Sequence, residues 1–228
     1  MLETNVKLIT ESIAQACGES KRPPESVNLI AVTKSVTADK AAGLLRYGIN
    51  KFAENRVDSL LEKQSYFQTE SIEWHLIGTL QRRKVKDVIN KIDYFHALDN
   101  FKLAAEIQKR ATKPVNCFVQ VNVSKEESKH GLLLEDTIDF VKSLSEFDNI
   151  NIVGLMTMAP YQADVGFIQD CFDTLAEKQK EIANLKIKNA PCTELSMGMS
   201  QDFAQAIQAG ATYVRIGSAF FKDKESEG

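Results

Sequence analysis

No run of apolar residues in this chain of 228 approaches the ~18 consecutive positions that a transmembrane helix requires. The opening residues, Met-Leu-Glu-Thr-Asn-Val-Lys, also lack the basic and then apolar pattern of a secretory signal peptide. From both absences we expect a cytoplasmic protein without a membrane segment.

Cysteine and histidine are too sparse and too scattered to suggest a metal site or a disulfide framework. The four cysteines (Cys17, Cys117, Cys171 and Cys192) are widely spaced and form no C-x-x-C pair. The three histidines have no carboxylate or thiol partner at the spacing of metal ligands. We therefore expect reduced thiols and no bound metal.

An excess of positive charge is also missing, because the formal net charge is −3. Such a chain has no overall attraction to nucleic acid or to an anionic membrane surface. One cluster, Arg82-Arg83-Lys84 with Lys86, could suggest nucleic-acid binding, but no aromatic residues are interleaved with it. We interpret the cluster as a solvated helix face and expect neither nucleic acid nor membrane as a partner.

No Pro/Gly/Ser-rich linker, low-complexity segment or internal repeat divides the chain. Apolar residues make up 43% of it, which is enough for a sizeable core. We therefore expect residues 1–228 to form a single domain.

Short apolar or β-branched segments alternate along the chain with segments of helical periodicity. Strands are expected at residues 27–33, 51–53, 73–77, 94–97, 115–123, 150–156, 193–196 and 212–216. Helices are expected at residues 2–17, 38–47, 56–67, 82–90, 101–111, 134–145, 165–185 and 201–209. Repeated βα units favour an α/β fold, a closed (β/α)₈ TIM barrel with an extra N-terminal helix. An open, doubly wound sheet is the alternative.

Two Ser/Gly-rich segments near the C-terminus, 195–203 and 211–219, suggest a phosphate site. In a barrel they would follow the seventh and eighth strands, where this fold usually binds phosphate. We expect Ser196, Ser200, Gly217 and Ser218 to bind it through hydroxyl and backbone N–H groups. The alternative is turn and capping chemistry, since Ser200 precedes a predicted helix as a good N-cap.

Lys34 ends the first apolar strand, Asn28-Leu-Ile-Ala-Val-Thr-Lys34, and would stand at the mouth of the barrel. One lysine there, together with a phosphate site, suggests pyridoxal 5′-phosphate (PLP) held as a Schiff base. We expect Lys34 to be buried near other cations, which would favour the neutral amine that this bond needs. An ordinary surface lysine is the alternative.

Several segments, in order along nearly the whole chain, resemble those of the pyridoxal phosphate homeostasis proteins, a family related to the barrel domain of alanine racemase. The matching segments are Ala31-Val-Thr-Lys34, Glu54-Asn-Arg56, Trp74-His-Leu-Ile-Gly-Thr-Leu-Gln81, His96-Ala-Leu-Asp99, residues 120–131, Gly154-Leu-Met-Thr-Met-Ala159, Leu195-Ser-Met-Gly-Met-Ser200 and Val214-Arg-Ile-Gly-Ser-Ala219. Together they are far more specific than any one match.

The resemblance implies roles for three further positions. Lys34 matches the family's Schiff-base lysine, and Asn55 matches an asparagine near the ring hydroxyl or the pocket wall. Likeness to the racemase barrel implies that Arg215 lies near the pyridine nitrogen, where its charge would disfavour protonation of that nitrogen. A structural ion pair is the alternative for Arg215.

Two other groups of residues are more ambiguous. Met156, Met158, Met197 and Met199 could line the ring pocket, although methionine is also a routine core filler. His75 lies within a strand, where we expect a core histidine with satisfied hydrogen bonds and no catalytic role.

The resemblance implies a protein that binds PLP, adjusts its free concentration and transfers it to apo forms of PLP enzymes, without catalytic residues of its own. Nothing demands a dimer, so we expect a monomer. The alternative is an amino-acid racemase, which needs a base on each face of the cofactor. The chain ends just after the last strand, so we expect no second domain, and we expect no tyrosine near the barrel mouth as a substitute base. A phosphate-sugar barrel enzyme without PLP is a third possibility.

Overall fold

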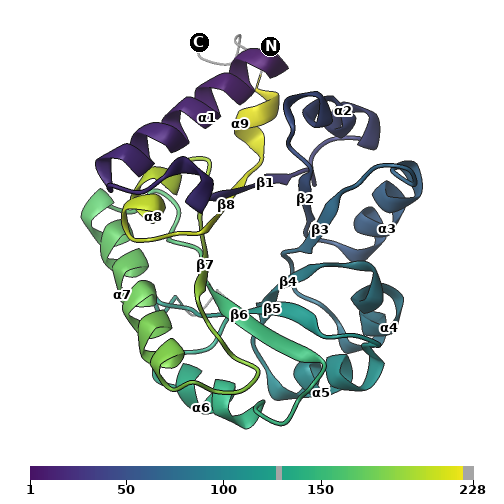
Figure 1. Ribbon diagram of the computed structural model, residues 1–228, viewed down its shortest axis with the longest axis vertical. Coiled ribbons are helices and arrows are strands. Elements are labelled where there is room, and N and C mark those ends of the chain that lie inside the picture. The colour runs from purple at the N-terminus through teal and green to yellow at the C-terminus, as the bar shows by residue number, and fades with distance from the viewer. Residues whose placement is uncertain (127–129, 223–228) are drawn as a thin grey trace.

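Eight parallel strands close into a barrel in the order β1 to β8 in the computed structural model, which describes residues 1–126 and 130–222 (Figure 1). The strands are β1 (Asn28–Val32), β2 (Lys51–Glu54), β3 (Glu73–Leu76), β4 (Tyr94–Leu98), β5 (Val115–Gln120), β6 (Ile150–Met156), β7 (Glu194–Met199) and β8 (Tyr213–Ile216). Pairing of β1 with β8 as well as with β2 closes the ring. The predicted TIM barrel is therefore confirmed. The matching segment 120–131 lies partly outside the described residues.

Near-continuous burial along the strands explains why their sequences read as apolar runs and not as alternating patterns. All four residues of β8 are buried, as are the last three residues of β1, β2 and β3. Strands of a parallel barrel face side chains on the inside and helices on the outside, so neither face meets water.

Helices form a ring around the barrel (Figure 1). The α-helices are α1 (Leu2–Glu19), α2 (Ala38–Ala42), α3 (Val57–Tyr66), α4 (Val85–Val88), α5 (Phe101–Arg110), α6 (Thr137–Ser143), α7 (Val165–Asn184), α8 (Phe203–Gln208) and α9 (Ser218–Phe221). Short 3₁₀ helices are η1 (Pro24–Ser26), η2 (Gly43–Tyr47), η3 (Arg82–Lys84) and η4 (Ile89–Lys91). Side-chain caps start α5 and α7: the Asn100 side chain accepts from Leu103 N at 2.9 Å, and that of Asp164 accepts from Gly166 N at 2.8 Å.

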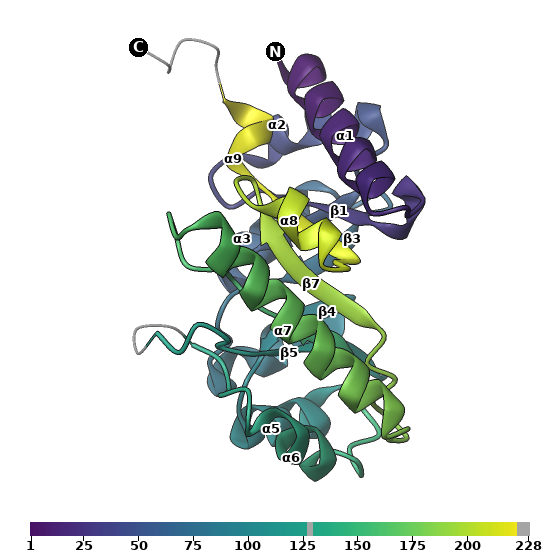
Figure 2. The ribbon, with the colours of Figure 1, turned by 90° about the vertical axis from the view of Figure 1, so that its left-hand side faces the viewer.

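The extra N-terminal helix α1 precedes the first strand, as expected. Its buried residues Val6, Ile9, Ile13 and Ala16 recur at helical spacing along one face. That face packs against α8 and α9, and Figure 2 shows α1 beside α8. Among the helices of the described residues, none is both long and apolar enough to span a membrane.

Element boundaries differ from the sequence predictions at several points. The helix expected at 82–90 is broken into η3, α4 and η4, a stretch containing β-branched Val85, Val88 and Ile89, which favour helix weakly. Strand β5 ends at Gln120 and not at residue 123, because the chain then pairs with its own loop: Asn122 N donates to Leu132 O at 2.8 Å. Helix α9 had no counterpart among the predicted elements.

The end of β7 differs most, because the strand runs to Met199 and not to Ser196. Gly198 has φ +92°, and a Cβ there would lie 2.6 Å from the Ala206 side chain on α8. Glycine thus lets the strand end turn tightly beneath the helix. As a result α8 starts at Phe203, with Asp202 and not Ser200 in the N-cap position, so the capping interpretation of Ser200 was wrong.

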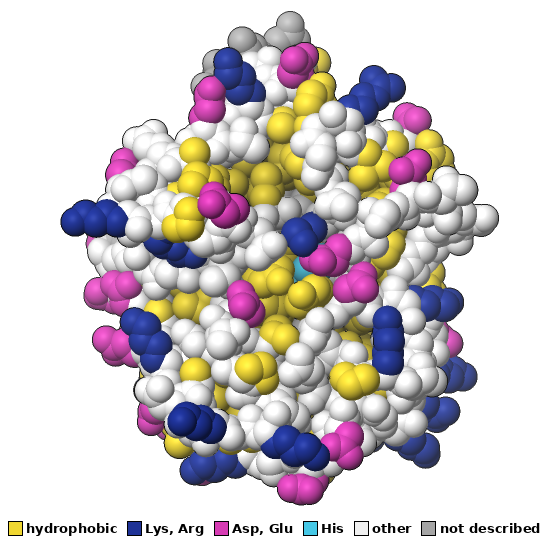
Figure 3. Space-filling view, in the orientation of Figure 1, with side chains coloured by type: hydrophobic (Ala, Val, Ile, Leu, Met, Phe, Trp, Pro, Cys, Tyr) yellow, Lys and Arg dark blue, Asp and Glu magenta, His cyan; other side chains and the backbone are white. Residues whose placement is uncertain are grey.

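Charged side chains of both signs are interspersed over the face shown in Figure 3. The basic cluster noted in the sequence is largely exposed, and Lys84 within it donates to both carboxylate oxygens of Asp58, at 2.9 and 2.7 Å. These placements agree with a solvated surface.

Candidate functional site

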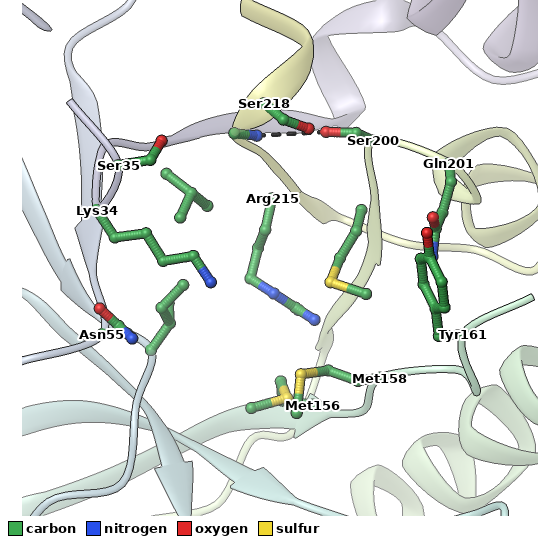
Figure 4. A pocket seen from close by; sticks show the side chains of 14 residues that line it. Lys34, Ser35, Asn55, Met156, Met158, Tyr161, Ser200, Gln201, Arg215 and Ser218 are labelled. Carbon is green, nitrogen blue, oxygen red and sulfur yellow. Dashed lines mark hydrogen bonds between the residues drawn. The ribbon is translucent and has the colours of Figure 1, made fainter.

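A cavity of about 550 Å³ opens where the carboxyl ends of the strands meet (Figure 4). Its lining includes six of the seven candidate site residues: Lys34, Asn55, Ser200, Arg215, Gly217 and Ser218. Val32, Ser35, Ile77, Met156, Met158, Tyr161, Met199 and Gln201 complete it. Positions separated by more than 180 residues thus meet at the face of the barrel where function was expected.

Lys34 reaches the cavity from the loop that follows β1, and its side chain extends toward that of Arg215 in Figure 4. Lys34 is exposed, so the expectation that it would be buried was wrong. The expected neighbouring cation is present, since Arg215 lines the same cavity. An exposed amine at the edge of a cavity is accessible to a ligand from solvent.

The backbone immediately before Lys34 is held by a buried polar cluster. Lys63, on α3, donates to Thr33 O at 2.9 Å and to Glu54 Oε1 at 2.6 Å. The Thr33 hydroxyl donates to the same Glu54 oxygen at 2.6 Å. Because Glu54 is fully buried and Lys63 only 6% exposed, the residues flanking Lys34 and Asn55 are fixed from behind.

Three hydrogen-bonding groups line the cavity beside the end of β1, at the ends of β7 and β8: Ser200, Gly217 and Ser218. Gly217 N donates to Ser200 Oγ at a long 3.4 Å (Figure 4). A Cβ at Gly217 would lie 3.2 Å from Val32 O, so glycine lets the last strand approach the first closely here. Hydroxyl and N–H groups at this spot can receive an anion.

Asp202 fixes the turn that presents Ser200. Its Oδ1 accepts from Met199 N at 2.6 Å, and its own N–H donates to Met199 O at 3.1 Å. Its second oxygen, Oδ2, is buried without a hydrogen-bond partner among the described residues. Burial therefore raises the pKa of Asp202, against the lowering effects of the Met199 N–H and of Arg215.

Asn55 enters the cavity from the end of β2, and the neighbouring loop fits tightly against it. A Cβ at Gly78 would lie 2.1 Å from Asn55 O, so this close approach requires glycine. Asn55 is thereby held on the same side of the cavity as Lys34 (Figure 4).

Arg215 rises from β8 into the barrel and is only 4% exposed. It donates to Ser196 Oγ at 2.6 Å through Nη1 and to Thr157 O at 2.9 Å through Nη2. Burial lowers the pKa of Arg215 to about 10, so the guanidinium is charged at neutral pH. Both hydrogen-bond partners are uncharged, which does not favour the structural ion-pair interpretation.

Ser196 is the candidate residue that does not line the cavity. It is fully buried within β7, where it contacts Arg215 and lies 2.8 Å from His96 Nδ1. His75 is also fully buried and hydrogen-bonded, as expected of a core histidine.

Part of the cavity lining was not predicted from the sequence. Ser35 and Gln201 adjoin predicted residues, so adjacency could have found them. Tyr161, which is 72% exposed, comes from the loop after β6, and the expectation of no tyrosine near the barrel mouth was wrong. Among the four candidate methionines, Met156, Met158 and Met199 line the cavity, whereas Met197 is buried elsewhere.

The lining chemistry fits an anionic ligand with an apolar body. Lys34 and Arg215 supply positive charge, and none of the 14 lining residues is acidic. Methionine and aliphatic side chains form the walls between the charged and hydroxyl groups. In residues 1–126 and 130–222, no three His, Cys, Asp or Glu side chains are grouped so as to hold a metal ion.

Comparisons with known proteins point in one direction. A family model described as the N-terminal domain of alanine racemase matches residues 11–225. A pyridoxal phosphate homeostasis protein of Aquifex aeolicus is 35% identical over 220 residues, which cover 95% of this chain and 96% of that one. The structure of PipY from Synechococcus elongatus with PLP bound has a TM-score of 0.81 at 30% identity, and the match covers 94% of this chain and 100% of that one. An alanine racemase of Clostridium difficile shares the fold at 14% identity and a TM-score of 0.75, and the match covers 99% of this chain and 57% of that one.

Proposed function

The chain belongs to the pyridoxal phosphate homeostasis protein family, and on that premise we propose that it binds PLP as a Schiff base on Lys34. The observation that carries the proposal is the cavity in which Lys34 faces Arg215 and the hydroxyl and N–H groups of Ser200, Gly217 and Ser218 (Figure 4). The protein then acts as one PLP-binding domain, over residues 1–228, that keeps the free concentration of a reactive aldehyde low.

Each predicted site residue that lines the cavity has a task in this proposal. The Lys34 amine bonds to the aldehyde carbon of PLP, and one water is released. Ser200, Gly217 N–H and Ser218 bind the phosphate, and Asn55 lies along the ring. Arg215 presents a charged guanidinium to the ring nitrogen and so disfavours its protonation.

When bound, PLP supplies an aldehyde that captures amines and a ring that can withdraw electrons. A charged Arg215 weakens that ring as an electron acceptor, a feature that the likeness to the racemase barrel makes common to a carrier and a racemase. Ser196, expected to bind phosphate, instead contacts Arg215, so we propose that it acts on the cofactor through that side chain.

We propose that the chain is a non-catalytic carrier that works as a cytoplasmic monomer and transfers PLP to apo forms of PLP enzymes. The names of the relatives support homeostasis as the role. The cavity already holds candidate groups for the aldehyde, the ring and the phosphate, so the proposal needs no second chain. The alternative, an amino-acid racemase, gains one argument from Tyr161, a candidate second base at the cavity.

A visible absorbance titration with PLP tests the Schiff base. Wild-type protein should develop an imine band that borohydride removes, and Lys34→Ala should not. Lys40→Ala is the matched control, because Lys40 is an exposed lysine outside the cavity, on the next helix. No band in any protein would overturn the cofactor assignment and favour a phosphate-sugar barrel. An equal band in Lys34→Ala would mean that another lysine is used.

Carrier and racemase are separated by following PLP-loaded protein with an apo PLP enzyme or with L-alanine. A carrier restores the activity of the apo-enzyme and leaves the alanine optically unchanged. Racemisation that Tyr161→Phe abolishes would overturn the carrier proposal.

A further inference from the structure

A continuous hydrogen-bonded chain of side chains crosses the barrel interior from the cavity to the starts of the strands. Arg215 Nη1 donates to Ser196 Oγ at 2.6 Å, and Ser196 Oγ lies 2.8 Å from His96 Nδ1. His96 Nε2 lies 2.9 Å from His75 Nδ1, and His75 Nε2 lies 2.9 Å from Glu73 Oε1. Glu73 is the first residue of β3, whereas Arg215 lies near the end of β8.

The side chains in the middle of this hydrogen-bonded series are buried in the core. Ser196, His75 and His96 are fully buried. The His75 ring stacks on Tyr94 at 4.8 Å between ring centroids, and the His96 ring stacks on Phe118 at 4.4 Å. Packing thus fixes both imidazole planes. The positions of the ring protons then decide which atom donates and which accepts in each hydrogen bond.

The negative charge of Glu73 sets the donor-to-acceptor direction of these hydrogen bonds. Although burial opposes ionisation, hydrogen bonds from His75 and Lys51 lower the pKa of Glu73 to about 2. Burial lowers the pKa of both histidines, so each is neutral at pH 7 and has one donor and one acceptor nitrogen. An ionised carboxylate only accepts, so His75 must donate through Nε2.

The other proton positions follow in sequence from that one. His75 Nδ1 has no proton and must accept from His96 Nε2. His96 Nδ1 then accepts from the Ser196 hydroxyl. With its proton directed at His96, the Ser196 oxygen presents its lone pairs to Arg215 Nη1. Each donor in the chain therefore points away from the cavity, toward Glu73.

The opposite direction would weaken the hold on Arg215. If His96 Nδ1 carried the proton, it would donate to the same Ser196 oxygen as Arg215 Nη1, and that oxygen would have to use both of its lone pairs to accept the two bonds. The Ser196 hydroxyl would also lose its acceptor inside the core, which is costly for a buried polar group. The carboxylate at the far end of the barrel thus selects the arrangement that serves Arg215.

We propose that Glu73, His75 and His96 are positioning residues for Arg215: the Glu73 carboxylate selects the Nε2–H tautomer of both histidines and so directs the Ser196 hydroxyl that holds the guanidinium in the cavity. No change of protonation is involved. Only the part of the test that uses a ligand rests on the proposed PLP function.

The direct test is ¹⁵N NMR of the two imidazoles in ligand-free, histidine-labelled protein at pH 7. Long-range ¹H–¹⁵N correlations distinguish a protonated from an unprotonated ring nitrogen. The proposal predicts protonated Nε2 and unprotonated Nδ1 in both His75 and His96. A protonated Nδ1 in either ring of the wild-type protein would overturn it, and this result needs no variant.

Two substitutions at Glu73, which is partly exposed, then test whether its carboxylate determines the tautomers. Glu73→Gln keeps an oxygen acceptor and should retain both tautomers, whereas Glu73→Met removes the acceptor and should populate Nδ1–H forms and shift the Arg215 side-chain signals. Unchanged tautomers and Arg215 signals in Glu73→Met would contradict the proposal. With ligand, Glu73→Met should weaken binding of PLP and of phosphate-free pyridoxal by the same factor, roughly fivefold, because Arg215 faces the ring. If wild-type protein binds neither compound, the proposed function fails while the NMR result stands.

Discussion

The ammonium group of Lys63 lies 2.6 Å from a carboxylate oxygen of Glu54, behind the loop that carries Lys34. Lys63 also donates to the Thr33 carbonyl, one residue before Lys34, at 2.9 Å. A charged pair in the core is costly to desolvate, and one Glu54 oxygen is left without a partner among the described residues. The benefit lies in joining α3 to the ends of β1 and β2, the strands that deliver Lys34 and Asn55.

Removing one member of this pair should destabilise the protein strongly. Lys63→Met leaves Glu54 buried and unpaired, and the expected loss in free energy of unfolding is about 3–5 kcal/mol. Urea denaturation measures it. The double variant Lys63→Met/Glu54→Gln should recover part of the loss, since no charge remains buried. Lys188→Met, which breaks the exposed pair with Asp148, is the control and should change little. Equal losses in free energy of unfolding for Lys63→Met and Lys188→Met would contradict this prediction.

Ser200 should distinguish PLP from pyridoxal, which lacks the phosphate. A hydrogen bond to a charged group contributes about 1.5–3 kcal/mol, so Ser200→Ala should weaken PLP binding roughly 10- to 100-fold. Affinity for pyridoxal should not change. Fluorescence or absorbance titrations with both compounds measure this, with Ser65→Ala, an exposed serine on α3, as control. Equal losses for the two ligands would show that Ser200 does not bind the phosphate.

Replacing the Asp202 carboxylate with an amide should increase the affinity for a phosphate ligand. Asp202→Asn keeps an oxygen that accepts from Met199 N, but it removes a buried negative charge near the residues proposed to bind phosphate. We expect PLP affinity to rise severalfold in Asp202→Asn and to fall in Asp202→Ala, which loses the turn as well. Titration of both variants with PLP decides this. A loss in Asp202→Asn as large as that in Asp202→Ala would mean that the charge itself is needed.

Acid should destabilise the protein before its carboxylates titrate. The folded pKa values of His75 and His96 lie below the unfolded value of about 6.5, because burial disfavours the charged ring. The unfolded chain therefore binds more protons, and the free energy of unfolding falls as pH drops below about 6.5, by up to ~1.4 kcal/mol per pH unit for each histidine.

Urea denaturation between pH 8 and pH 5 measures this slope. His130→Gln, which replaces an exposed histidine, is the control and should keep the wild-type slope. Asp202 acts in the opposite direction, because its raised pKa favours the folded state as this carboxyl takes up its proton. A stability that stays constant or rises from pH 7 to pH 5 would refute neutral buried histidines.

Periodicity was enough to predict the barrel, and local motifs together with the family resemblance predicted most of the cavity. Asn55 was predicted from the family resemblance, whereas Lys34, two residues after the end of β1, was located by the rule that function gathers at strand ends. The same reasoning placed Ser200, Gly217 and Ser218. Ser196 was misplaced because the boundary of β7 was set three residues too early.

Contacts between distant side chains could not be predicted in this way. His96 and Ser196 are 100 residues apart, and each has an ordinary strand context. Tyr161 lies on a loop whose path depends on tertiary packing, so nothing local indicated that it lines the cavity. The exposure of Lys34 was missed because strand burial ends at Thr33, one residue earlier.

Borohydride reduction followed by peptide mapping tests the central claim most directly. Protein saturated with PLP is reduced, digested and analysed by mass spectrometry, with PLP-free protein treated in parallel. The account predicts a phosphopyridoxyl group on Lys34 at near one per chain, and none above background on the other lysines. Modification spread over exposed lysines, or concentrated on one outside the cavity, would contradict it.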